Sequence, residues 1–240
     1  MAEFETVRRA GAGTRSVAID EGLRAHMNKV YGLMSVGMLV TAAVAWIVGN
    51  NEALLATFFT GPIRWVVMFA PLIAIFAFGA AINRLSVGAA QAFFYGFAAL
   101  MGLSIAWIFA VFTDYSITQT FLVTSIAFGG LSLWGYTTKK DISGWGSFLI
   151  MGVIGLIVAS IINIFIASSA LQFAISAIGL LIFAGLTAYD TQNIKNTYLQ
   201  MAHYGETEWL EKSAIMGALN LYLDFVNMFM FLLSFMGGRE

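Results

Sequence analysis

The sequence contains no cysteine, and it has only two prolines and two histidines. Without cysteine the chain has no disulfide bond, no attached haem and no thiolate metal site. His26 and His203 both lie outside the long apolar runs, so they cannot form the histidine cluster of a metal-dependent membrane hydrolase. The segment GLSLWG (Gly130–Gly135) is only loosely similar to a serine-hydrolase elbow, and no buried histidine is at hand as its base. These absences argue against an enzyme.

Charge is also scarce. Only 10% of the residues are charged, against about 25% in a soluble globular domain. The net charge of −1 argues against binding to nucleic acid, which requires a basic surface. Hydrophobic side chains make up 60% of the chain, which indicates an all-α integral membrane protein.

Apolar runs of the length that spans a bilayer, about 20 residues, occur seven times along the chain. We predict membrane helices over residues 29–49, 62–82, 89–112, 116–137, 147–167, 170–190 and 213–235. The first run follows a long polar leader, so we expect an uncleaved helix rather than a signal peptide. The fifth and sixth runs are separated only by a weak turn, Ala167–Gln172, so a re-entrant hairpin is the alternative there. Six spans in place of seven would put the C-terminus inside.

Residues 1–28 are predicted to form a polar N-terminal tail, and residues 29–240 the transmembrane domain. Within the tail, Ile19–Met27 suits either a short interfacial helix or a partly ordered segment. The basic residues indicate the orientation. A cytoplasmic N-terminus with seven spans leaves only Arg64 and Arg239 outside and places the other ten lysines and arginines inside.

Asp224 is the one ionisable residue clearly inside a predicted span. It lies about 16 Å along the helix axis from Ser213, which is close to the middle of the bilayer. It belongs to a polar stripe at spacings of three, four and seven residues, which follows one helical face. The stripe consists of Ser213, Gly217, Asn220, Asp224, Asn227 and Ser234. Such a stripe must face protein or water, and interhelical hydrogen bonding is its plain structural explanation.

Asp190 is predicted at the end of the sixth span, with Thr187 one turn earlier and Thr191 beside it. By depth alone it is an acid at a helix end. If the helix continues through TQNIKN and is tilted, Asp190 lies deeper and can approach the last span. Arg84, between the second and third spans, either follows the positive-inside rule or reaches a buried carboxylate by snorkelling.

The segments AYDTQNIKN and GALNLYLDFVNMFMFLL together resemble the paired signature of the Bax inhibitor family, and Gly88–Phe109 is similar to its third helix. The resemblance implies seven helices with the last near the centre of the bundle, and the polar leader is similar to that of bacterial, inner-membrane members. It also implies a pH-sensitive calcium leak, in which Asp190 and Asp224 form a pair and Arg84 is the matching basic gate partner. Some bacterial members are linked to a membrane protease.

We therefore expect two carboxylates that cannot both ionise easily, and whose shared proton, or Arg84, holds the last two helices together. Without the proton the two carboxylates repel each other or bind Ca²⁺ transiently. Asn220, Asn227 or backbone carbonyls would supply further oxygen ligands. Thr187 and Thr191 are expected near the pore. Calcium is then the transported ion and no cofactor is needed. A non-transporting regulator that binds membrane proteins such as a protease is the competing class. A proton-coupled transporter ranks third, since no repeat is visible.

Overall fold

The computed structural model describes residues 2–202 and 207–238, and all regular structure in these ranges is helical. Within these ranges, seven helices are long and apolar enough to span a membrane, as predicted. They are α1 (Ala2–Gly49), α3 (Ile63–Ala81), α4 (Val87–Ile105) with the 3₁₀ turn η1 (Ala106–Ala110), α5 (Asp114–Thr137), α6 (Trp145–Ile166), α7 (Ser169–Met201) and α8 (Thr207–Met236). The short helix α2 (Glu52–Phe59) was not predicted. Its N-cap Asn51 accepts a hydrogen bond from the Leu54 amide.

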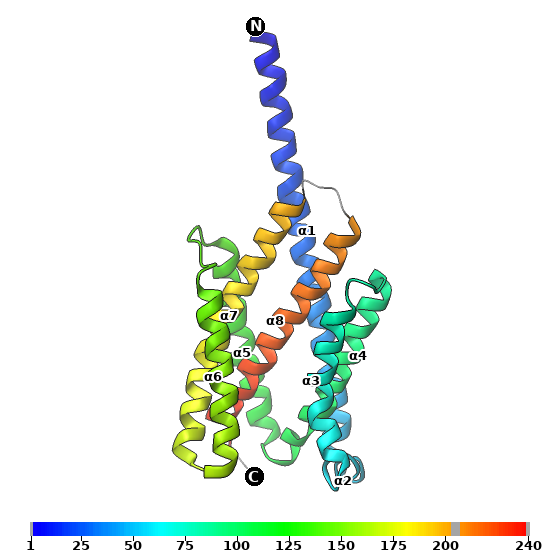
Figure 1. The fold of residues 1–240 in the computed structure, drawn as a ribbon, viewed down its shortest axis with the longest axis vertical. Coiled ribbons are helices and arrows are strands. Elements are labelled where there is room, and N and C mark those ends of the chain that lie inside the picture. The colour runs from blue at the N-terminus through cyan, green and yellow to red at the C-terminus, as the bar shows by residue number, and fades with distance from the viewer. Residues whose placement is uncertain (1, 203–206, 239–240) are drawn as a thin grey trace.

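Helix α8 runs through the middle of the bundle (Figure 1). In the most apolar window of α8, 67% of the residues are buried, against 39% or fewer in every other span. The expected central position of the last helix is confirmed. The other helices expose large apolar side chains such as Phe76, Phe148 and Phe165, which is the pattern expected of surfaces that face lipid.

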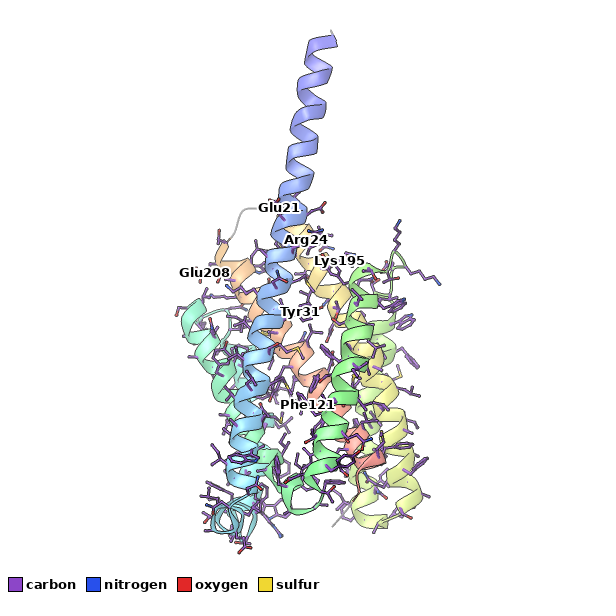
Figure 2. The ribbon with its side chains drawn as sticks, turned by 180° about the vertical axis from the view of Figure 1, so that it is seen from behind. Glu21, Arg24, Tyr31, Phe121, Lys195 and Glu208 are labelled. Atoms are coloured by element: carbon purple, nitrogen blue, oxygen red, sulfur yellow. The ribbon has the colours of Figure 1, made fainter. Side chains whose placement is uncertain are left out.

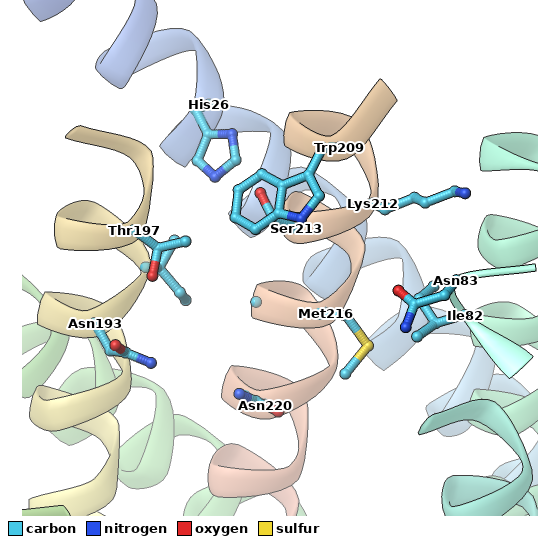
Figure 3. Close-up of a pocket in the computed structure, with 12 residues that line it drawn as sticks. His26, Ile82, Asn83, Asn193, Thr197, Trp209, Lys212, Ser213, Met216 and Asn220 are labelled. Atoms are coloured by element: carbon cyan, nitrogen blue, oxygen red, sulfur yellow. The ribbon is translucent and has the colours of Figure 1, made fainter. Parts of the chain in front are cut away.

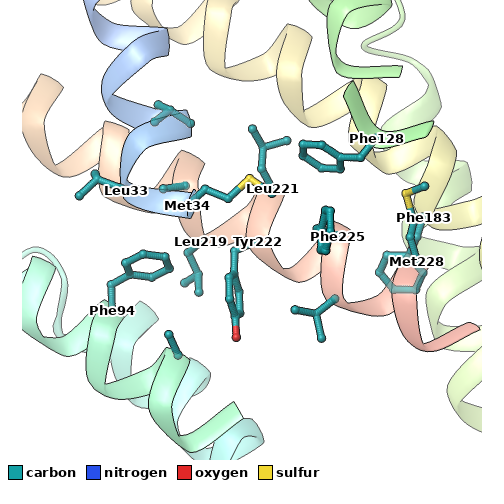
Figure 4. Close-up of a cluster of buried hydrophobic side chains, with 14 of the residues drawn as sticks. Leu33, Met34, Phe94, Phe128, Phe183, Leu219, Leu221, Tyr222, Phe225 and Met228 are labelled. Carbon is teal, nitrogen blue, oxygen red and sulfur yellow. The ribbon is translucent and has the colours of Figure 1, made fainter. Parts of the chain in front are cut away.

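Aromatic and aliphatic side chains hold α8 in the centre of the bundle (Figure 4). The Tyr222 ring lies edge-on to Phe94 of α4, with ring centroids 5.8 Å apart. Phe225 meets Phe128 of α5 at 5.5 Å. Aromatic pairs in these edge-to-face geometries are favourable beyond the area they bury. The core therefore fixes both the depth and the rotation of α8, and with them the direction in which its polar stripe points.

Helix α7 continues through Met201, so the predicted end at residue 190 is wrong. Tertiary contacts explain the extension. The Gln192 amide accepts from the Ile142 backbone N–H (2.9 Å) and donates to the Lys140 carbonyl (2.8 Å), while Lys195 Nζ donates to the Tyr136 carbonyl (2.7 Å). These partners, from α5 and the α5–α6 loop, support polar residues that a local reading assigns to a loop. Helix α8 likewise begins at Thr207, before the predicted residue 213.

The connection between α6 and α7 is a tight turn. Ala167 adopts a left-handed conformation (φ 52°), and Asn163 Oδ1 accepts a hydrogen bond from the Ser168 amide. Ser168 then caps α7 by accepting from the Leu171 amide. Both helices are long and apolar enough to span a membrane, which supports two separate spans here in place of a re-entrant hairpin.

Residues 19–27 belong to the continuous helix α1 rather than to a separate interfacial helix. Leu23 and Met27 are buried there against the bundle. The first part of α1 projects beyond one end of the bundle, at the top of Figure 1, which we call the upper end. His203 and Arg239 lie outside the described residues.

Candidate functional site

The polar stripe of α8 faces α7. Gly217 packs against Ile194, where an added Cβ would come within 2.9 Å of the Ile194 side chain. Lower down, Ser234 Oγ lies 3.2 Å from Ser176 Oγ and accepts its hydrogen bond. Between these two contacts lies Asp224, whose side chain is 3% exposed. The stripe is therefore turned toward protein, and it brings Asp224 to the turn of α7 that carries Asp190.

The side chains of Asp190 and Asp224 meet across the α7–α8 interface, close enough for a hydrogen bond between the two carboxyl groups. A hydrogen bond between two carboxyl groups requires that one of them hold a proton, because ionised carboxylates only accept. One oxygen of Asp224, Oδ2, is buried and accepts no hydrogen bond from any donor group among the described residues. An unpartnered buried carboxyl oxygen is costly. The site therefore holds two neighbouring carboxyl groups, and an oxygen of one of them lacks any other hydrogen-bond donor.

Thr187 and Thr191, the two threonines predicted beside the pair, are fully buried on α7. Each hydroxyl donates to the carbonyl four residues earlier, and Thr187 Oγ1 also lies 3.3 Å from Met228 Sδ of α8. Thr191 Oγ1 is 2.9 Å from Ser132 Oγ of α5, which in turn is 2.5 Å from the Tyr31 hydroxyl of α1. The chain of hydroxyl groups ties α1 and α5 to the turn of α7 that bears Asp190.

A close backbone contact reinforces this arrangement. A Cβ added to Gly135 of α5 would lie 2.3 Å from the carbonyl oxygen of Ala188 on α7. Only glycine permits this approach, which is the usual way that small residues bring membrane helices together. Because Ala188 is two residues from Asp190, the position of the α7 carboxylate depends on this contact.

A pocket of about 280 Å³, lined by several polar side chains, opens between α7 and α8 (Figure 3). Asn193 of α7 and Asn220 of α8 extend toward each other in it. Asn193 follows Asp190 by about one helical turn and Asn220 precedes Asp224 by about one turn, so the pocket ends close to both carboxyl groups. His26, Thr197, Lys212 and Ser213 also line it.

Two further residues predicted for the site, Asn227 and Arg84, differ in their relation to the aspartate pair. Asn227 is half-buried, and its amide donates to the Leu223 carbonyl of its own helix (2.8 Å). Arg84 does not join the site. It is exposed in the turn that follows α3, and no ion pair among the described residues includes it. The reason is that α3 ends at Ala81, which leaves Arg84 at the upper end rather than on a helical face directed into the bundle.

Sequence reasoning missed Tyr31, Ser132, Gly135 and the ion pair between Lys29 of α1 and Glu211 of α8. Ser132 and Gly135 both belong to GLSLWG, which we considered only as an enzyme motif. The spacing of a small hydroxyl residue and a glycine on one helical face was the available signal, since both favour close helix contacts in membranes.

The described residues contain no cluster of three or more histidine, cysteine, aspartate or glutamate side chains. A cation at Asp190 and Asp224 would thus draw its further ligands from amide, hydroxyl or carbonyl oxygens. Hard cations such as Ca²⁺ accept such oxygens but bind weakly when few carboxylates contribute. This donor set is suited to transient binding.

Comparison with known proteins identifies the family. The sequence profile "Inhibitor of apoptosis-promoting Bax1" matches residues 23–240. The inner membrane protein YbhL of Escherichia coli is 44% identical over 220 residues, which cover 91% of this chain and 94% of that protein. An uncharacterized protein of Caulobacter vibrioides is 43% identical over 238 residues (95% and 94%), and YrjE of Lactococcus lactis is 38% identical over 226 residues (90% and 92%).

The match covers every spanning helix and both acidic segments, in keeping with the resemblance seen in AYDTQNIKN and NLYLDFVN. The seven spans and the inner-membrane relative agree with the predicted location in a bacterial inner membrane. The chain is an integral membrane protein and belongs to the Bax inhibitor family.

Proposed function

We propose that this protein is a pH-sensitive calcium leak channel, gated by Asp190 and Asp224. The observation that supports it most is the buried pair of neighbouring carboxyl groups, in which Asp224 Oδ2 has no other hydrogen-bond donor among the described residues. A purely structural contact would be made as well by asparagine, without the cost of a charge in the membrane. Family membership and the pocket between α7 and α8 agree with this function.

The mechanism follows from the proton. While the pair shares one, the hydrogen bond holds α7 against α8. When the proton leaves, two like charges face each other where the effective dielectric constant is low, so their repulsion is far stronger than in water. The helices then separate, or a divalent cation enters from the pocket and takes the place of the proton.

The described conformation is closed. On the lower side of the pair, Phe225 lies between Phe121 and Phe128 of α5, each ring centroid 5.5 Å from its own. We propose that this packed aromatic contact closes the path on the lower side of the pair, so that conduction requires α8 to move. We propose that the upper end is cytoplasmic, because Arg24, Arg84, Lys139, Lys140 and Lys195 lie at that end whereas Arg64 lies at the other.

Calcium entry into liposomes that contain the purified protein tests this function. Flux is expected to rise as the pH is raised from about 6 to about 8, because raising the pH removes the shared proton. Empty liposomes and a panel of other cations are the controls. Absence of flux at every pH would reject the channel and favour the non-transporting regulator, which needs partner proteins and moves no ions by itself.

Arg84→Ala tests whether Arg84 holds the aspartate pair closed, as the family resemblance suggests, or has no part in the gate, as its exposed position suggests. Since Arg84 is exposed and contacts neither carboxyl group, its removal is expected to change the closed-state leak by less than about twofold, as for ordinary surface substitutions. The same liposome assay at low pH measures this leak. A large rise in basal leak would show instead that Arg84 holds the pair closed.

A further inference from the structure

Helices α1 and α5 run alongside each other but do not pack together (Figure 2). Among the described residues, α1 packs on α2, α4, α7, α8 and η1, and α5 packs on α7, α8 and η1. Tyr31 and Ser132 form the hydrogen bond that crosses the space between α1 and α5. Two hollows lie along this seam, one of about 420 Å³ near the upper end and one of about 220 Å³ below it.

The upper hollow is polar and basic at its rim. Arg24 and Asn28 of α1 line it together with Ser132 and Tyr136 of α5. Arg24 is exposed and forms no ion pair with any residue in the described ranges. Lys195 reaches the same rim, where its ammonium group donates to the Tyr136 carbonyl and lies 5.5 Å from the centre of the Tyr136 ring. The Tyr136 carbonyl and ring are neutral, so they do not compensate the charge of Lys195. Arg24 and Lys195 therefore both keep a positive charge at this rim.

The acid nearest to Arg24 along α1, Glu21, does not neutralise it. Glu21 is exposed about one turn farther out, and it forms no ion pair within the described part of the chain. Figure 2 shows Glu21 above Arg24 on α1, with Lys195 on the neighbouring helix. The rim therefore offers two positive groups at the level where a membrane presents its headgroups.

The lower hollow is apolar. Met38 of α1, Ile108 of η1, Phe121 of α5 and Phe229 of α8 line it. Met38 follows Arg24 by about 21 Å along the helix axis, and half of a bilayer, with its headgroup layer included, measures about 20–22 Å. The seam thus begins with cations at the surface and ends in an apolar recess at the depth of acyl-chain ends in the same leaflet.

We propose that this seam binds one phospholipid with an anionic headgroup. Arg24 and Lys195 contact the phosphate, since guanidinium and ammonium groups form charge-assisted hydrogen bonds with phosphate oxygens, and basic pockets between membrane helices suit such headgroups. An acyl chain lies against Phe128 and Gly129 and ends in the lower hollow. Lipid binding at this seam does not depend on channel activity or on the aspartate pair.

Native mass spectrometry of the purified protein with phosphatidylglycerol and phosphatidylcholine of the same chain length tests the site. The unchanged protein is expected to retain phosphatidylglycerol in preference, and Arg24→Gln to weaken its binding about fivefold, as for one cation near a membrane surface. The matched control is Arg64→Gln, which removes a cation that lies over Trp65 at the other end of the bundle. Equal retention of both lipids, or equal effects of the two substitutions, would overturn the proposal.

Two neighbouring glycines test the location. An added Cβ meets no atom within 4 Å at either Gly129 or Gly130, but only Gly129 lines the upper hollow. Gly129→Leu is expected to fill the hollow and displace phosphatidylglycerol, whereas Gly130→Leu leaves binding unchanged. Glycerol 3-phosphate is expected not to compete, because it lacks acyl chains. Identical behaviour of the two leucine variants, or competition by glycerol 3-phosphate, would contradict a lipid in this seam.

Discussion

Asp224→Asn is expected to abolish the rise of calcium flux with pH in liposomes. The amide still offers hydrogen bonds to Asp190 but cannot lose a proton in this range, so the α7–α8 contact no longer changes with pH. The variant is expected to fold, since a neutral side chain replaces an acid at a buried position in the membrane. Size-exclusion profiles in detergent check folding, and flux from about pH 6 to about pH 8 provides the readout.

Because Asp190 and Asp224 act as one unit in this mechanism, substitution of either residue should have the same effect on the pH dependence of flux. Asp190→Asn should flatten the profile in the same way, and the double variant should resemble either single one, because groups that act together are not additive. Two independent sites would instead give a double variant with a larger effect than each single variant. A pH profile that survives Asp224→Asn would refute gating by the pair.

Asp141→Asn is the matched control, since Asp141 is an exposed acid in the α5–α6 loop, outside the spanning helices. The Ser143 backbone N–H donates to its carboxylate (2.9 Å), and this hydrogen bond holds the pKa of Asp141 below its usual value. Asp141 is therefore ionised throughout the assayed range. Its substitution is expected to leave the pH profile unchanged.

Gly135→Ala is expected to destabilise the protein relative to Gly130→Ala. Both substitutions gain the same helix propensity, but the Cβ at position 135 would lie 2.3 Å from the Ala188 carbonyl oxygen, whereas the Cβ at 130 meets nothing within 4 Å. Overpacking of this kind costs about 1–3 kcal/mol. Thermal unfolding in detergent measures the difference, at about 2–4 °C per kcal/mol for a chain of this size.

Gly135→Ala and Gly130→Ala also test whether α5 positions Asp190. If α5 positions the α7 turn that carries Asp190, Gly135→Ala should also alter the pH dependence of flux, and Gly130→Ala should not. Equal melting temperatures for the two variants would show that α5 and α7 can separate freely. The close contact would then not position the carboxyl group.

The sequence by itself determined the membrane setting, the seven spans and the polar stripe of α8. Each is a local property: hydropathy is a sum over neighbouring residues, and spacings of three and four residues define a helical face whatever surrounds it. The paired acidic segments likewise indicate the family from the sequence alone.

Only the tertiary structure decided where these faces meet. The end of α7 was misjudged because Gln192 and Lys195 are held by partners far away in the chain, at Lys140, Ile142 and Tyr136. The contact between Asp190 and Asp224 depends on how α7 and α8 are rotated, and the packing of Gly135, Gly217 and the aromatic core sets that rotation. The exposure of Arg84 and the seam between α1 and α5 are likewise products of packing, which local spacing does not encode.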